Sequence, residues 1–214
     1  MSTLKSFVAA QLDKLPLVAI LRGLKPSEAL DIGSALHDSG IQVMEVTLNS
    51  PEPLKSIELL ANRFDGKMAI GAGTVLSAEN VTLVREAGGQ LIVSPNVDAE
   101  VISRAVELGM HSLPGAMTCT ECFQALKAGA NGLKIFPASV MGVSGVKDLM
   151  AVIPRETHIF AVGGVTDSNM ADWLSLGIKG VGLGSNIYLA GDTPAMAAAK
   201  AKRMIAAFRV GRPA

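Results

Sequence analysis

The sequence has no excess of charge of either sign, which narrows the class of partner. Its 214 residues include 19 Lys and Arg against 19 Asp and Glu, so the formal net charge is zero and the pI is near 6.8. Binding to a nucleic acid backbone or to an anionic membrane requires a surplus of basic side chains. We therefore expect neither partner, although one Arg or a few backbone amides can still hold a small anion.

Three further features that the sequence lacks concern location. It has only two cysteines, Cys119 and Cys122, which fit a reducing compartment without a disulfide framework. Their C-x-x-C spacing is also typical of a redox pair or half a zinc site, but no second pair accompanies them, so we interpret them as small residues near a helix start. No stretch approaches the roughly 18 apolar residues of a membrane span, and the N-terminal segment lacks the pattern of a secretory signal. We expect a cytoplasmic protein.

The sequence does contain eight short apolar runs, whose first residues are 20 to 26 positions apart. One strand, one helix and two loops fill such a gap, and apolar strands that alternate with helices indicate a parallel sheet covered by helices. We predict an α/β protein with a single small (β/α)₈ TIM barrel over residues 1–214 and an additional N-terminal helix over Leu4–Leu12; an open doubly wound sheet is the alternative. The runs are Leu17–Leu21, Val43–Leu48, Met68–Ile70, Leu91–Val93, His111–Leu113, Leu133–Phe136, Ile159–Val162 and Val181–Leu183.

Capping residues punctuate the predicted helices. Ser77 and Thr118 are typical N-caps, and Glu121 three residues after Thr118 completes a capping box. Glycines stand where helix C-termini require a left-handed residue. They include Gly88, Gly109, Gly129 and Gly177. The last helix is expected over Ala195–Phe208.

Lys134 is out of place in the sixth apolar run. Side-chain alternation puts Leu133 and Ile135 on one face of the strand and Lys134 on the other, which is the interior in a barrel. Burial disfavours the ammonium form and lowers the pKa, and a neutral lysine is the nucleophile that forms a Schiff base with a ketone. A lysine that reaches solvent or is paired for structure is the alternative. The mid-strand position favours catalysis.

Glu45 is the second misplaced charge, in the second apolar run. It shares a strand face with Val43 and Thr47, and across a barrel it can face Lys134. A carboxylate is rarely buried there without a partner. Glu45 is therefore either a general acid/base with a raised pKa or half of a structural ion pair with Lys134. Its position alone leaves both open.

Polar residues follow the first, third and fourth runs, at the end of the strands where barrels carry their active sites. Arg22 can grip a carboxylate there with two hydrogen bonds, although a plain surface arginine is the alternative. Thr74 follows Gly71-Ala-Gly, and Pro95 lies in Ser94-Pro-Asn96. The glycine and proline content indicates close backbone approach to a ligand or to a neighbouring strand.

Glycines follow the last two runs. Gly163 and Gly164 come after the seventh, and Gly184 and Ser185 come after the eighth, where we expect them to open a helix. Exposed amides at a helix N-terminus bind anions without a basic side chain, and barrels often bind phosphate after strands seven and eight. The spacing Gly180-Val-Gly-Leu-Gly184 is not read as a dinucleotide fingerprint, because that motif follows a first strand.

Taken in order, these strand ends resemble the bacterial 2-keto-3-deoxy-6-phosphogluconate/6-phosphogalactonate aldolases. These are small class I aldolases with a (β/α)₈ barrel, and the likeness covers the whole chain. It rests on Ala19-Ile-Leu-Arg-Gly-Leu24, Glu45-Val-Thr-Leu-Asn-Ser-Pro51, Gly71-Ala-Gly-Thr-Val75, Ser94-Pro-Asn96, Pro114-Gly-Ala-Met-Thr118, Leu133-Lys-Ile-Phe-Pro137, Ala161-Val-Gly-Gly-Val165 and Gly182-Leu-Gly-Ser185.

The resemblance implies a role for each candidate residue. Lys134 would be the Schiff-base lysine, and Glu45 the general acid/base, acting through a water. Thr74 and the turn at Pro95 would form the pocket for the pyruvate carboxylate. The amides after the last two strands would hold the substrate phosphate. Neither a metal nor another cofactor is implied, and the family suggests a homotrimer.

Two positions bear on the substrate. Gluconate-type enzymes carry Arg where this chain has Asn49 and tend to have Thr where it has Val162. In the galactonate-type branch Asn is usual at the first position, and Arg22 becomes the cationic ligand of the carboxylate. The resemblance therefore favours cleavage of 2-dehydro-3-deoxy-6-phosphogalactonate to pyruvate and D-glyceraldehyde 3-phosphate. The alternatives are the gluconate epimer, 4-hydroxy-2-oxoglutarate, an isomerase or epimerase barrel, and a sugar-phosphate-binding barrel without turnover.

Overall fold

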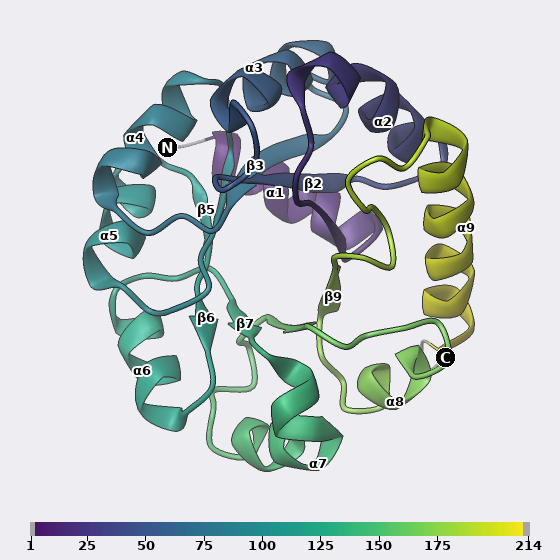
Figure 1. Cartoon of the computed structure of the whole chain (residues 1–214). Helices are drawn as coiled ribbons and strands as arrows, with labels where there is room; N and C mark the ends of the chain where they lie inside the picture. Colours follow the sequence, from purple (N-terminus) through teal and green to yellow (C-terminus); the bar gives the residue numbers. More distant parts are fainter. Residues whose placement is uncertain (1–2, 212–214) are drawn as a thin grey trace.

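The computed structural model describes residues 3–211, so the first two and last three positions of the predicted domain lie outside the described residues. Strands alternate with helices along the chain, and the helices surround the strands (Figure 1). The strands are β1 (Leu17–Leu21), β2 (Val43–Thr47), β3 (Ala69–Gly73), β4 (Leu91–Val93), β5 (His111–Leu113), β6 (Gly115–Ala116), β7 (Leu133–Ile135), β8 (Ile159–Val162) and β9 (Gly180–Leu183). The helices are α1 (Thr3–Lys14), α2 (Pro26–Asp38), α3 (Pro53–Arg63), α4 (Ala78–Glu86), α5 (Ala99–Glu107), α6 (Cys119–Lys127), α7 (Ala138–Met150), α8 (Met170–Leu174) and α9 (Pro194–Gly211).

The sheet closes on itself at Pro114. Neighbouring strands are parallel and run in the order β5-β4-β3-β2-β1-β9-β8-β7-β6. The two ends of this series belong to one stretch of chain, because only Pro114, which has no amide N–H, separates β5 from β6. The carbonyl oxygen of Pro114 accepts a hydrogen bond from the amide of Lys134 at 2.9 Å. The fifth strand thus joins β4 to β7, which confirms the predicted barrel over the open sheet.

Alternate residues of each strand face the helices or the barrel interior, as the sequence pattern predicted. Leu133 and Ile135 belong to the large core between strands and helices. A smaller core fills the lower part of the barrel interior. Its strand residues are Val18, Val43, Ala69, Leu91, Val93, Leu113 and Phe160.

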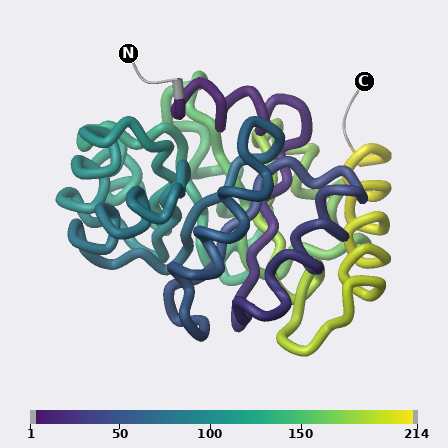
Figure 2. The backbone as a smooth tube through the Cα atoms, turned by 90° about the horizontal axis from the view of Figure 1, so that it is seen from above, coloured from purple at the N-terminus to yellow at the C-terminus, as the bar shows by residue number. Residues whose placement is uncertain are grey.

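Helix α1 covers the amino ends of the strands. Val8 and Leu12 are buried in the same inner core as the strand residues, and Figure 2 shows α1 lying across one end of the barrel. Burial of such a side chain contributes about 1.5–3 kcal/mol. The loops after β1, β2 and β9 project at the opposite end (Figure 2). A ligand must therefore approach from the carboxyl ends of the strands.

The predicted helix caps are confirmed, whereas the first and last helices are longer than the predicted Leu4–Leu12 and Ala195–Phe208. Ser77 accepts from the amide of Asn80 at 3.2 Å, and Thr118 and Glu121 form the reciprocal capping box. The C-terminal glycines have positive φ, the conformation that glycine adopts at the least cost. These are Gly88, Gly109, Gly129 and Gly177.

Two local predictions are wrong. The residues after β9 do not open a helix: the amides of Ile187 and Tyr188 donate to the carbonyl oxygen of Gly184 and form a single turn, which then leads into a loop. The third strand runs to Gly73 rather than ending at Ile70, because glycines in the interior do not register as an apolar run.

Among residues 3–211, no helix combines the length and hydropathy needed to cross a bilayer.

Candidate active site

Lys134 and Glu45 line the same small cavity inside the barrel, of about 10 Å³. They come from β7 and β2, which the closed sheet brings to opposite sides of the interior. The rest of the lining is apolar. It consists of Val18, Ile20, Val93, Leu113, Phe160, Val162 and Gly182.

Lys134 projects inward from the middle of β7 and is 7% exposed. Its Nζ donates to the carbonyl oxygen of Ser94 at 3.2 Å and lies 4.5 Å from the ring centroid of Phe136. Burial lowers the pKa of Lys134; the charge of Arg22 acts in the same direction, and the charge of Glu45 opposes both. A lowered pKa increases the fraction of neutral amine, which is the nucleophilic form.

Glu45 is buried at 2% exposure, and its Oε2 has no hydrogen-bond partner among the described residues. Burial raises the pKa of Glu45 to about 7, although the charges of Lys134 and Arg22 oppose the shift. No ion pair within the described part of the chain joins Glu45 to Lys134, so the structural ion pair considered above is not formed. Their charges nevertheless interact, and a pKa of about 7 lets Glu45 act as a general acid or base near neutral pH.

Gly73 makes room for the Glu45 carboxylate. A Cβ added to Gly73 would overlap both carboxylate oxygens of Glu45. The absence of a side chain at this position on β3 therefore leaves room for the Glu45 carboxylate. Sequence reasoning missed this role, because Gly73 was noted only as part of the segment that leads to Thr74.

Arg22 and Asn49 lie together at the mouth. Arg22 Nη1 donates to Asn49 Oδ1 at 2.9 Å, and both side chains are exposed. Just beneath them, the Ser50 hydroxyl accepts from the amide of Gly23 at 2.9 Å and contacts Thr47 Oγ1 at 3.0 Å. These bonds tie the loops after β1 and β2 to each other. Asn49 therefore orients the guanidinium of Arg22.

Thr74 and Pro95 follow β3 and β4 but line neither this inner cavity nor the outer pocket described below. Thr74 has a φ of 56°, which is strained for a residue with a β-branched side chain and marks a constrained loop. Ser94 Oγ donates to the carbonyl oxygen of Val75 at 2.8 Å, so the two loops are joined. Through its own carbonyl oxygen Ser94 also reaches Lys134, a backbone contact that side-chain motifs do not reveal.

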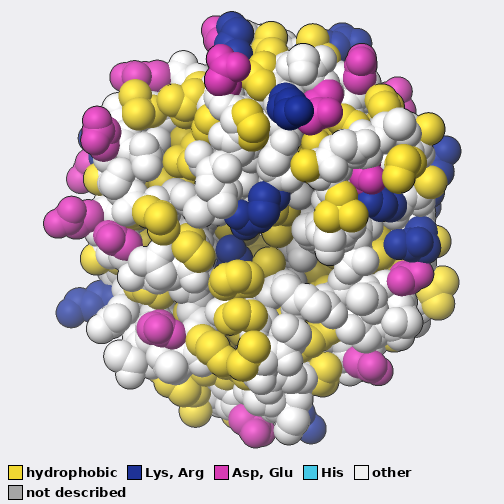
Figure 3. All heavy atoms as spheres, in the orientation of Figure 1, with side chains coloured by type: hydrophobic (Ala, Val, Ile, Leu, Met, Phe, Trp, Pro, Cys, Tyr) yellow, Lys and Arg dark blue, Asp and Glu magenta, His cyan; other side chains and the backbone are white. Residues whose placement is uncertain are grey.

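A larger outer pocket of about 540 Å³ opens above the inner cavity. It shares Ile20, Val162 and Gly182 with that cavity, and Figure 3 shows basic side chains at the central hollow of this face. A Cβ on Gly182 would lie 2.8 Å from Val162 Cγ2, so this glycine keeps the passage between the two spaces open. No sequence motif indicates this role for Gly182.

All four predicted phosphate ligands line the outer pocket: Gly163, Gly164, Gly184 and Ser185. Gly163 and Gly164 have φ values of 96° and 77°, which favour glycine. Within residues 3–211, no hydrogen bond uses the amide N–H of any of the four. Free amides that line one pocket are able to bind an anion even without a helix N-terminus.

Comparison with known proteins identifies the chain. A model of the family "KDPG and KHG aldolase" matches residues 8–201. The chain belongs to this aldolase family. The 2-dehydro-3-deoxy-6-phosphogalactonate aldolase of Escherichia coli (strain K12) is 48% identical over 196 residues, which cover 92% of this chain and 96% of that protein.

Solved structures show the same relationship for this aldolase. A structure described as native KDPGal has a TM-score of 0.91 and 47% identity, with 92% of this chain and 96% of the other covered. A cube-shaped protein cage designed by fusing symmetric oligomeric domains has the same TM-score and identity, with 92% of this chain and 73% of the other covered. The chain is thus an enzyme of the aldolase class with a (β/α)₈ fold.

Proposed function

We propose that this aldolase cleaves 2-dehydro-3-deoxy-6-phosphogalactonate to pyruvate and D-glyceraldehyde 3-phosphate through a Schiff base on Lys134. The observation that carries the proposal is the placement of Lys134 and Glu45 on one buried cavity beneath a pocket of free amides. The name of the 48% identical relative supports the choice of substrate.

The covalent step requires a neutral amine. Lys134 Nζ attacks the C2 ketone carbon, and proton transfers followed by loss of the C2 oxygen as water leave a protonated imine. Burial lowers the pKa of Lys134, so a larger fraction of this side chain is the neutral amine than for an exposed lysine at the same pH. The imine cation then accepts the electron pair of the C3–C4 bond.

Glu45 is proposed to move the protons. As a carboxylate it takes the proton of the C4 hydroxyl while the C3–C4 bond breaks, which leaves an aldehyde and an enamine. The acid form then returns a proton toward C3, and hydrolysis of the imine releases pyruvate and restores Lys134. A pKa of about 7 lets Glu45 act in both directions.

The two ends of the substrate are proposed to bind separate groups. Arg22, oriented by Asn49, holds the carboxylate. Thr74 and Pro95 line neither space, so their contact with the carboxylate stays a prediction of the family resemblance. The amides of Gly163, Gly164, Gly184 and Ser185 hold the phosphate. Fixing both ends places the C3–C4 bond over the lysine and supplies orientation.

Val162 is proposed to set the preference for the C4 epimer. It lines both the inner cavity and the outer pocket, where the middle of the substrate must pass. Its apolar side chain offers no hydrogen bond to a hydroxyl. Comparing cleavage rates on the galactonate and gluconate epimers tests this assignment, and a preference for the gluconate epimer contradicts it.

We also propose that the enzyme is a cytoplasmic homotrimer. The two free cysteines suit a reducing compartment, and the similar cage protein is built from symmetric oligomeric domains. Light scattering is expected to give three times the chain mass of 22.1 kDa.

Trapping with pyruvate and borohydride tests the covalent step. Wild-type protein is expected to gain a stable adduct on Lys134, seen by peptide mass spectrometry, and to lose activity. Lys134→Ala should show neither adduct nor turnover, and Lys134→Met keeps the packing volume as a check on folding. Lys147→Ala, at an exposed position of α7, is the matched control and should behave as wild type. Normal cleavage by Lys134→Ala would overturn the proposal and favour an epimerase-like barrel.

A further inference from the structure

The proposed phosphate site is built from two separate lengths of chain. Gly163 and Gly164 lie in the loop after β8, whereas Gly184 and Ser185 lie in the turn after β9. Each pair supplies amides to the same pocket. The spacing of the four amides therefore depends on how the two loops are held relative to each other.

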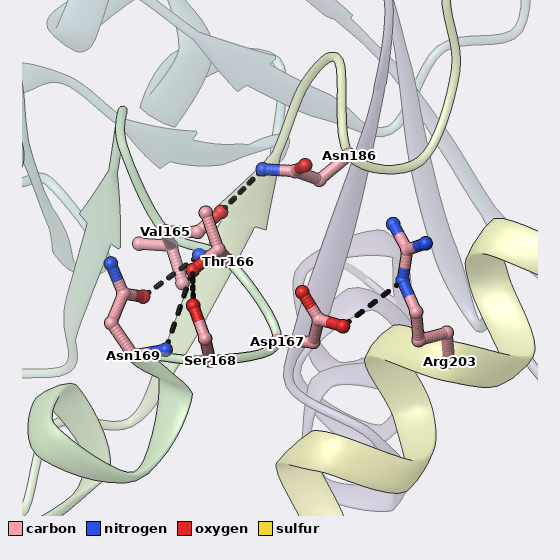
Figure 4. Close-up of polar contacts among 7 residues, drawn as sticks. All are labelled: Val165, Thr166, Asp167, Ser168, Asn169, Asn186 and Arg203. Carbon is pink, nitrogen blue, oxygen red and sulfur yellow. Dashed lines mark hydrogen bonds and ion pairs between the residues drawn. The ribbon is translucent and has the colours of Figure 1, made fainter.

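The loop after β8 is fixed by its own side chains (Figure 4). Asn169 Oδ1 accepts from the amide of Thr166 at 2.8 Å, and Asn169 Nδ2 donates to the carbonyl oxygen of Gly164 at 2.9 Å. The hydroxyl oxygens of Thr166 and Ser168 lie 2.9 Å apart. These bonds fix the conformation of the loop that directly follows the glycine pair.

The segment after β9 is fixed independently. Ile187 and Tyr188 donate to the carbonyl oxygen of Gly184. The Tyr188 side chain is buried, and its hydroxyl donates to Glu28 Oε1 in α2 at 2.9 Å. Each loop thus has hydrogen bonds of its own, and a bond between the two loops adds a restraint on their relative position.

Asn186 joins the two loops. Its Nδ2 donates to the carbonyl oxygen of Val165 at 2.7 Å, next to the glycine pair (Figure 4). Asn186 also directly follows Ser185 and lines the outer pocket. The ion pair between Asp167 and Arg203 connects the same loop to α9, but both side chains are about half exposed, so solvent weakens it.

We propose that Asn186 is a positioning residue that sets the spacing of the phosphate-binding amides, a proposal that rests on the function proposed above. The side chain acts through the backbone of Val165. Its effect is therefore confined to substrates that carry the phosphate.

Two substitutions at this position separate geometry from charge. Asn186→Ala removes the donor to Val165. Asn186→Asp keeps the size of the side chain, but its carboxylate has no N–H to donate and places a negative charge beside the anion. We expect the aspartate variant to bind the phosphorylated substrate less well than the alanine variant.

The experiment compares kcat and KM on 2-dehydro-3-deoxy-6-phosphogalactonate and on the same compound without phosphate. Loss of one hydrogen bond should raise the KM of Asn186→Ala for the phosphorylated substrate by roughly 3- to 10-fold. Its constants for the unphosphorylated compound and its borohydride trapping with pyruvate should match wild type. Asp167→Asn, which breaks only the surface ion pair, is the matched control and should leave both substrates unaffected.

Each outcome is decisive. If wild type discriminates between the two substrates and Asn186→Ala does so equally well, this inference is wrong while the proposed function stands. If the variant weakens both substrates by the same factor, Asn186 is a general structural residue. A wild-type enzyme that does not distinguish the substrates removes the phosphate site itself, and the inference with it.

Discussion

The two ends of the barrel interior both bury a titratable side chain, and burial shifts the two pKa values in opposite directions. At the amino end, His111 is 3% exposed, and burial, followed by the charges of Lys5 and His158, lowers its pKa to about 4. At the carboxyl end, burial raises the pKa of Glu45 to about 7. In each case the low-dielectric interior favours the uncharged form.

The ends differ in what surrounds the buried group. Glu45 shares a cavity with Lys134 and lies beneath an open pocket, whereas α1 packs over the end that holds His111. A shifted pKa therefore does not identify an active site by itself. A second interacting group and a space for a substrate are what make the carboxyl end the candidate active site.

The two groups also give opposite pH dependence of stability. Glu45 has a folded pKa above the ordinary 4.5, so its contribution is complete below pH 4.5 and is lost as the pH rises through about 7. His111 has a folded pKa below the ordinary 6.5, so its contribution is present above pH 6.5 and is lost as the pH falls through about 4.

Glu45→Gln should have the largest effect on the rate of cleavage. The amide keeps the shape of the side chain but cannot accept the proton, so kcat should fall by at least ~10²-fold. In wild type, kcat should rise with pH through about 7, as the carboxylate form appears, and this limb should vanish in the variant. Steady-state rates from pH 5 to 9 measure both effects, with the exposed Glu58→Gln as control. Persistence of the limb would assign it to another group.

Gly182→Ala should affect the full substrate more than pyruvate, because Gly182 lies where the inner cavity meets the outer pocket. The added methyl meets Val162 in the passage, so cleavage should fall by about 10-fold or more, as for one methylene too many in a fitted pocket. Pyruvate is shorter, so its borohydride adduct should still form. The double variant Gly182→Ala with Val162→Ala removes the contact and should recover part of the cleavage rate. Equal loss of cleavage and adduct would mean that the site itself is distorted.

His111→Leu should leave catalysis at pH 7 within about twofold of wild type, because the substrate cannot reach the end that α1 covers. Its effect should appear in stability: wild type loses roughly 3 kcal/mol more than the variant as the pH falls from 6.5 to 4, the value of a shift from 6.5 to about 4. Urea unfolding at several pH values measures the difference, from which the common Glu45 contribution cancels. His37→Gln in α2 is the control. A parallel pH dependence in wild type and His111→Leu would contradict the assignment.

Periodicity was sufficient to predict the barrel, because strand and helix spacing repeats along the chain and glycines end the helices. It missed what depends on an isolated residue. The continuation of the fifth strand past Pro114 needs only a carbonyl acceptor, which no apolar pattern encodes. A helix was predicted after β9, but only a turn forms there. The amides of Ile187 and Tyr188 both donate to the Gly184 carbonyl oxygen, and the chain then continues as a loop.

The residues of the candidate site also fall into those that the sequence predicted and those that it did not. Lys134 and Glu45 were found because a charge in an apolar strand is conspicuous. Gly73 and Gly182 were missed because their contribution is the space that a Cβ would fill, which is visible only once the facing side chain is known. Asn186 was missed because its partner is a backbone carbonyl in another loop.

The covering helix α1 has a kinetic consequence. Because α1 closes the amino end of the barrel, we expect reactants to enter and leave only at the carboxyl end. In the proposed mechanism, the three-carbon fragment bonded to Lys134 then lies deeper in the barrel than the phosphorylated aldehyde. The aldehyde must depart before water can free the keto acid. Turnover is therefore sequential in its exit, and in the synthetic direction the keto acid must be loaded first.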